Sequence, residues 1–242
     1  MSEVINPVVL RLTIRAAMGR KRALIFAIAP VIMILVSALL KLEAKSPVWP
    51  PEFLGDFGYS VVVALTALII GTSVLGAEID DSSVISLLAT PVRRSSVILS
   101  KFAGAALLTA IFAGLGEYFA GAIATGPSSK LAVGLLAGAL AASVVYNALF
   151  ILLSVLTTRA IAIGLLYLLI WEGLLSNLVS GVRMLSVDQY ALGIANSIAH
   201  ETALHAHLTL TTAVVMAVIV TCLALAYAAS RLRSFSLKGD AV

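Results

Sequence analysis

Charged residues are scarce in this sequence. Only 12% of its 242 residues are charged, whereas 61% are hydrophobic and the mean hydropathy is +1.09. In a soluble domain about a quarter of the residues are charged, and a chain with so few charged side chains cannot cover a globule of this size with a polar surface. The composition excludes an ordinary soluble domain and predicts one all-α integral membrane domain over residues 1–242.

The sequence has one cysteine, Cys222, and lacks several enzyme motifs. A single cysteine cannot form an intrachain disulfide. The phosphate loop G-x-x-x-x-G-K-[ST], the zinc motif H-E-x-x-H and the nucleophile motif G-x-S-x-G are all absent. We therefore expect no catalytic site, metal or cofactor in this chain. Its basic residues are scattered between apolar runs, which also argues against a nucleic-acid partner.

Six apolar runs are long enough to cross a bilayer. A spanning helix needs about 20 mostly apolar residues, because each residue rises about 1.5 Å in a hydrocarbon core about 30 Å thick. We expect the first run to be retained, since it is longer than the apolar part of a signal peptide. The expected spans are residues 23–40, 57–77, 102–125, 131–158, 160–182 and 208–230.

The basic residues predict the orientation. Short cytoplasmic loops are enriched in Lys and Arg, and an inside N-terminus places twelve of the sixteen basic residues on the cytoplasmic side. Both chain ends are therefore expected in the cytoplasm. In the leader, residues 1–22, Val8 and Leu12 alternate with Arg11 and Arg15 at helical spacing. This pattern predicts a helix in the cytoplasmic membrane interface, and the alternative is an unstructured basic leader.

Residues 78–101 form a cytoplasmic loop between the second and third expected spans. The loop begins acidic, becomes apolar and turns basic after Pro91. Asp80 and Ser82 suit the start of a helix, and Pro91 suits its end. The pattern predicts a short helix across the membrane face, and its apolar side chains need a protein partner to cover them.

This loop resembles the corresponding loop of ABC-2 type exporter permeases, whose usual pattern is an acid, Gly-Thr, a Leu pair, Pro, Arg and Lys. Ser82-Ser83 replaces the Gly-Thr. Residues 167–195, YLLIWEGLLSNLVSGVRMLSVDQYALGIA, are similar to the fifth span and the following external segment of many bacterial permeases in that family. The matching loop residues are Glu78, Leu87, Leu88, Pro91, Arg94 and Lys101.

The resemblance implies a transporter subunit of the bacterial inner membrane that has no enzyme activity of its own. Such a permease works as a pair, formed with a second copy or with a homologous permease. Two cytoplasmic ATPase subunits would bind ATP and magnesium and grip the loop as a coupling helix, to which Arg93 also belongs. The cargo stays open among a drug, a lipid, a peptide and a polymer.

Two carboxylates, Glu117 and Glu172, lie within the expected spans. A charge near the bilayer centre costs about 2.5–3.5 kcal/mol on insertion scales, so such residues face the protein interior, a partner or water. Glu172, with Tyr167 and Trp171 nearby, either lines a substrate pathway or pins an external turn. We favour the structural interpretation for both carboxylates. The alternative function is a stand-alone carrier or an intramembrane enzyme that uses Glu117 and Glu172.

Small and amide side chains in the spans predict helix packing. Asn147 is expected to form a hydrogen bond with a neighbouring helix, and Gly134 and Gly138 form a G-x-x-x-G that permits close approach.

The external segment, residues 183–207, is expected to contain short helices, with Ser186 as an N-cap. His200, His205 and His207 lie near its end, but their spacing does not place three ligands on one helix face. A solvated or interfacial helix is therefore the favoured interpretation over a metal site.

Overall fold

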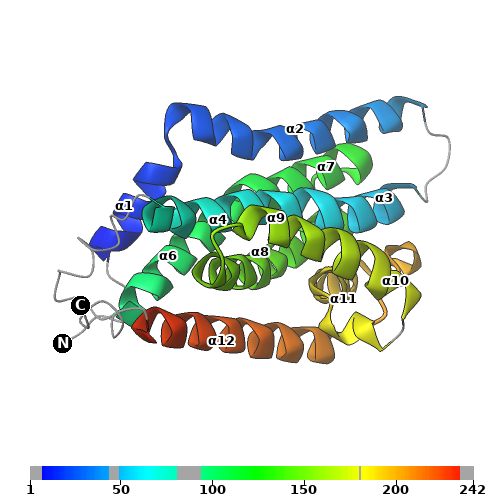
Figure 1. Ribbon diagram of the computed structural model, residues 1–242. Helices are drawn as coiled ribbons and strands as arrows, with labels where there is room; N and C mark the ends of the chain where they lie inside the picture. The colour runs from blue at the N-terminus through cyan, green and yellow to red at the C-terminus, as the bar shows by residue number, and fades with distance from the viewer. Residues whose placement is uncertain (1–6, 44–48, 81–93, 180, 235–242) are drawn as a thin grey trace, which may run out of the picture.

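The protein forms a bundle of helices (Figure 1). The computed structural model describes residues 7–43, 49–80, 94–179 and 181–234, and every regular element in these residues is helical, which confirms the all-α class. In order, with η1–η3 marking π-helical and η4–η5 marking 3-10 segments, the elements are α1 Pro7–Ala17, α2 Arg20–Glu43, α3 Trp49–Phe57, η1 Gly58–Val63, α4 Ala64–Asp80, α6 Arg94–Thr109, η2 Ala110–Gly114, α7 Leu115–Thr125, α8 Lys130–Leu156, α9 Ala160–Tyr167, η3 Leu168–Leu175, α10 Ser176–Leu178, η4 Val182–Leu185, α11 Val187–Ala199, η5 Thr202–Leu204 and α12 Leu210–Ser234.

Five of the described helices are long and apolar enough to cross a membrane. Lipid offers no hydrogen bonds to the backbone, and a helix satisfies its own N–H and C=O groups. The chain is therefore a helical membrane protein. The five candidate spans are Ala23–Glu43, Trp49–Val74, Ser96–Thr125, Lys130–Leu156 and Leu210–Arg231.

The remaining expected span, residues 160–182, differs from the other five. Its apolar helix, Ala160–Leu175, is shorter than they are. Helical structure stops at Leu178, and Val179 has the extended backbone angles φ −118° and ψ 109°. The expected span was too long because the helix ends at Leu178, although the sequence has no charged residue between there and Val182.

Two expected span boundaries were wrong. The second span begins at Trp49 and not at residue 57, because Pro50 and Pro51 occupy the first turn of α3, where the missing proline N–H has no helical partner to lose.

The helix of the third expected span is α6, which begins at Arg94 and not at residue 102. Lys101 therefore lies within α6 and is only 2% exposed. Its ammonium group donates a hydrogen bond to the Val74 carbonyl of α4 at 3.0 Å, which explains how a lysine is accommodated in this packed helix.

The core surrounds α8, which packs against α4, α7, α11 and α12. Three tyrosines, Tyr59, Tyr146 and Tyr190, are fully buried there. In contrast, only 22% of the apolar window of the first span and 17% of that of the last are buried inside the protein. The outward apolar faces of α2 and α12 are thus available to lipid or to another membrane protein.

Three helices contain a π-helical segment, and η1 packs against both η2 and η3. Single π turns inside α-helices frequently occur at functional sites. Glu172 lies in η3, and Glu117 lies in the first turn of α7, directly after η2. The two carboxylates selected from the sequence therefore adjoin this irregular part of the bundle.

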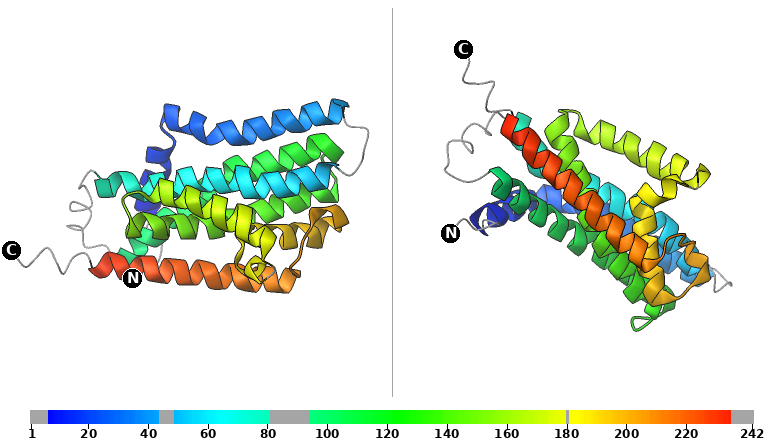
Figure 2. Two further views of the ribbon diagram at one scale, coloured as in Figure 1. Left: turned by 45° about the vertical axis from the view of Figure 1, so that its right-hand side comes forward. Right: turned by 90° about the horizontal axis from the view of Figure 1, so that it is seen from below.

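The ends of several helices gather at one end of the bundle. Helix α1, the first turns of α6 and the C-terminal end of α12 lie together there in both figures (Figures 1 and 2). The turn between α7 and α8 lies at the opposite end (Figure 1).

Candidate functional site

The Glu172 carboxyl group is buried and fully hydrogen-bonded. The residue is 3% exposed. Its Oε1 accepts hydrogen bonds from the Tyr167 hydroxyl at 3.0 Å and from the Val187 backbone N–H at 2.9 Å. Its Oε2 accepts one from the Ser186 hydroxyl. The carboxyl group therefore joins η3 to the start of α11, fifteen residues further along the chain.

Ser186 connects this carboxyl group to a helix start. Its hydroxyl donates to Glu172 and also accepts from the Gln189 backbone N–H at 3.4 Å, which makes Ser186 the N-cap of α11, as predicted. The first N–H groups of a helix have no partner within the helix and form its positive end. Glu172 therefore occupies the position where a helix best stabilises a carboxylate.

The two aromatic residues predicted beside Glu172 lie in the same assembly. The Tyr167 and Trp171 rings stack with their centroids 6.5 Å apart, and Tyr167 also meets Phe150 edge to face. The Trp171 indole N–H donates to the Leu185 carbonyl at 3.3 Å. These contacts fix the turn between η3 and α11, so the arrangement favours a pinning role for Glu172 over direct contact with substrate.

Glu117 has the opposite environment. Its side chain is 0% exposed, and neither carboxyl oxygen has a hydrogen-bond partner among the described residues. Both oxygens face Gly58 in η1, where an added Cβ would lie 2.5 Å from each of them. The carboxyl group fits only because residue 58 has no side chain. A buried polar group without a partner is costly and calls for an explanation.

The two carboxyl groups are not hydrogen-bonded to each other. General acid–base groups work within hydrogen-bond reach of one another or of the reacting atoms. The Glu172 oxygens are occupied by α11 and Tyr167, and Glu117 bonds to no described residue. Their shared feature is burial near a π-helical segment.

The sequence analysis missed Asp188, in the first turn of α11. Burial raises the pKa of its carboxyl group well above the usual value, and the nearby carboxyl groups of Glu172 and Asp56 act in the same direction. Burial, followed by the influence of Glu172, also raises the pKa of Tyr190 to about 12. The available sequence signal was the position of Asp188 directly after the Ser186-Val187 helix start.

Asn147 and the paired glycines have structural roles. The Asn147 amide donates to the Thr109 hydroxyl of α6 at 2.9 Å, which confirms the expected hydrogen bond between helices. An added Cβ at Gly134 would lie 2.6 Å from the Ala195 carbonyl oxygen, and one at Gly138 would lie 2.6 Å from that of Ala191. The G-x-x-x-G thus serves packing of α8 against α11 within the chain.

Two of the three histidines of the expected external segment lie at helix ends. His200 ends α11 and His205 ends η5, both with left-handed backbone angles, φ 57° and φ 47°. Partial burial and then the charges of Arg183 and His205 lower the pKa of His207. Among the described residues, no group of three His, Cys, Asp or Glu side chains is placed to hold a metal ion.

The predicted coupling residues fall at the edge of the described chain. Glu78 lies in the last turn of α4, and Arg94 begins α6. Lys101, within α6, is buried against α4, as described above. The predicted coupling helix, with Leu87, Leu88, Pro91 and Arg93, lies outside the described residues.

Comparison with known proteins gives no family. No protein-family model matches the chain, and no curated protein matches its sequence. The class that the fold defines is a helical membrane protein with five helices able to span a bilayer.

Proposed function

We propose that this chain is the membrane-spanning subunit of an ATP-driven exporter of the ABC-2 type. It pairs with a second permease, and each permease binds one cytoplasmic ATPase subunit. The carrying observation is that the start of α6, α1 and the end of α12 lie at one end of the bundle (Figure 1). Helix α4 ends at Asp80 and α6 begins at Arg94. The sequence between these two helix ends is the one that resembles a coupling helix.

The proposal includes six membrane crossings with both chain ends in the cytoplasm. The helix Ala160–Leu178, formed by α9, η3 and α10, supplies the additional crossing. Two features support it: the part Ala160–Leu175 is an apolar helix, and the hydrogen bond from the Val187 N–H to Glu172 ties its far end to α11. An even number of crossings agrees with α1 and the end of α12 lying together (Figure 2).

The carrier and intramembrane-enzyme alternatives depend on Glu117 and Glu172. Glu172 has no free oxygen with which to serve a substrate, since its hydrogen bonds go to the protein itself. Glu117 is the remaining candidate because neither of its carboxyl oxygens has a hydrogen-bond partner in the part of the chain that the structure describes. Transport by the purified chain alone, without an ATPase, would support the carrier alternative.

The test is purification of the tagged chain from the membranes of its native host. We expect an ATPase subunit to co-purify in equal amount, and nucleotide turnover to accompany it. Replacing Leu87 and Leu88 with Asp, together with Arg93→Glu and Arg94→Glu, should abolish both. Arg159→Glu is the matched control, because Arg159 is an exposed arginine on another connection, between α8 and α9. Unchanged ATPase attachment in the quadruple variant would refute the proposal.

A further inference from the structure

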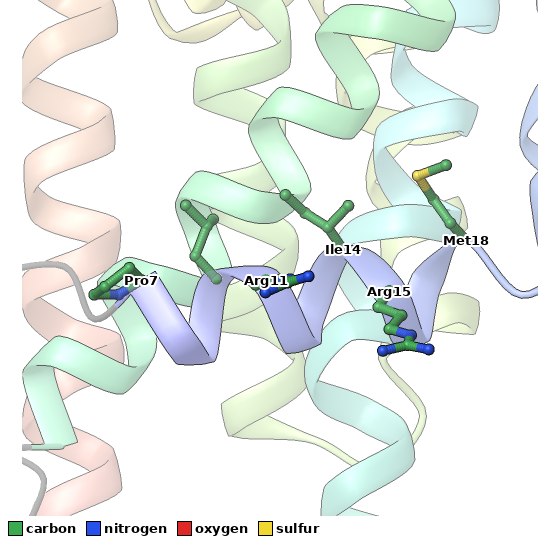
Figure 3. A pocket seen from close by; sticks show the side chains of 6 residues that line it. Pro7, Arg11, Ile14, Arg15 and Met18 are labelled. Atoms are coloured by element: carbon green, nitrogen blue, oxygen red, sulfur yellow. The ribbon is translucent and has the colours of Figure 1, made fainter.

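Helix α1 crosses the spanning helices and presents a basic face. Figure 3 shows α1 running across the helices behind it, with Arg11 and Arg15 on its near side. Both arginines are exposed, and they are four residues apart, so they share one face of the helix. Helix α1 contains no acidic residue, and neither guanidinium group forms an ion pair with a described residue.

The opposite face of α1 is fixed to the bundle. Thr13 and Ala17 are buried, and α1 packs against α6 and α4. An added Cβ at Gly104 of α6 would lie 3.0 Å from the Thr13 methyl carbon, so the glycine allows the two helices to approach closely. The basic face therefore has a fixed position and direction relative to the spans.

A groove of about 600 Å³ runs along the basic face (Figure 3). Apolar side chains are exposed on the same helix: Met18, which lines the groove, is 51% exposed, and Leu12, next to Arg11 in the sequence, is 61% exposed. Exposed apolar side chains beside two cations that pair with no described residue are poorly suited to water. They are well suited to the boundary between headgroups and acyl chains. The groove is lined by Pro7, Leu10, Arg11, Ile14, Arg15 and Met18.

We propose that this groove binds an anionic phospholipid of the cytoplasmic leaflet. The lipid phosphate bridges Arg11 and Arg15, and its acyl chains lie along Leu10, Ile14 and Met18. Charge complementarity selects the ligand, since guanidinium groups pair well with phosphate and nothing acidic on α1 competes. The location selects a lipid over a soluble anion, because α1 lies crosswise at the end of an apolar bundle (Figure 1). The inference is independent of the proposed exporter function.

The test uses the full chain purified in detergent and titrated with short-chain phosphatidylglycerol or phosphatidylcholine. Bound lipid is counted by native mass spectrometry. We expect preferential binding of phosphatidylglycerol, and the double variant R11Q/R15Q should lose about ten- to thirtyfold of this affinity. R11K/R15K should keep most of it. Arg159→Gln, an exposed arginine outside α1, should keep all of it.

Three outcomes would overturn the inference. One is equal binding of the two lipids, and the second is unchanged phosphatidylglycerol binding by R11Q/R15Q. The third is competition by glycerol phosphate as strong as that of the whole lipid, which would indicate a site for soluble phosphate. Because Arg11 and Arg15 are exposed, the thermal midpoint of R11Q/R15Q without lipid should match that of the parent protein, so a loss of binding reports on the site itself.

Discussion

The Glu172 carboxyl group accepts a hydrogen bond from the Val187 backbone N–H at 2.9 Å, and this bond joins an apolar helix to the start of the next one. Val187 is the first residue of α11, so its N–H has no partner within the helix. Glu172 thus acts as a second helix cap beside Ser186, in line with the structural interpretation favoured from the sequence. Substitutions at Glu172 can therefore distinguish a role in stabilising the fold from a role in transport.

Replacing Glu172 separates these two roles. Glu172→Ala leaves the Val187 N–H and the Ser186 hydroxyl buried without this acceptor, and should lower the free energy of unfolding by about 1–3 kcal/mol. Glu172→Gln keeps one acceptor oxygen, so the loss should be smaller and export should remain near the parent level. Thermal unfolding in detergent and a transport assay measure the two quantities. Exposed Glu201→Gln is the control, and a stable Glu172→Gln protein without export would contradict the pinning role.

Replacing Glu117 should raise the free energy of unfolding, whereas replacing Glu172 should lower it. Neither of its oxygens has a partner among the described residues, so Glu117→Met removes an uncompensated polar group while filling similar space. We expect the free energy of unfolding to rise by about 1–3 kcal/mol. The measurement is the thermal midpoint, compared with that of Glu172→Met, which should fall. A lower midpoint for Glu117→Met would mean that its carboxyl group has a stabilising partner such as bound water.

The Glu117 carboxyl group occupies the space that a side chain at position 58 would need. An added Cβ would lie 2.5 Å from both Glu117 oxygens, so Gly58→Ala should cost about 1–3 kcal/mol of stability through overpacking. Combining it with Glu117→Ala should recover most of that loss, which a double-mutant cycle measures. Gly114→Ala is the matched control in another π-helical segment, since its nearest contact would be an ordinary 3.6 Å. Equal effects at the two glycines would contradict the predicted contact.

The bond between Asn147 and Thr109 should couple the fourth and third apolar helices. Asn147→Leu and Thr109→Val each remove one side of a buried 2.9 Å hydrogen bond. Hydrogen bonds between membrane helices are worth about 0.6–1.7 kcal/mol in double-mutant cycles, and we expect a coupling energy in this range from thermal or denaturant unfolding. Ser73→Ala, which removes a bond within α4 alone, is the control. Strict additivity of the two substitutions would show that the bond does not contribute.

The sequence predicted individual interactions where a local rule applied. Ser186 was recognisable as an N-cap because a serine precedes an apolar helical run, and Asn147 as a packing residue because an amide in lipid must find a partner. The sequence contained no local pattern that would predict the close contact between Gly58 and the Glu117 carboxyl group. These residues lie far apart in the chain, and only helix packing brings them together.

By itself, the sequence determined that this protein is surrounded by lipid and that its secondary structure is helical. Apolar runs of this length exclude water as the surroundings, and a backbone in lipid must form helices. Tertiary structure decided where each helix ends and what each buried polar group does. Lys101 lies inside a helix because the Val74 carbonyl is within reach. Among the described residues the Glu172 carboxyl group has hydrogen-bond partners and that of Glu117 has none, because only Glu172 meets the start of another helix. Such differences depend on contacts between distant segments, which periodicity and composition do not encode.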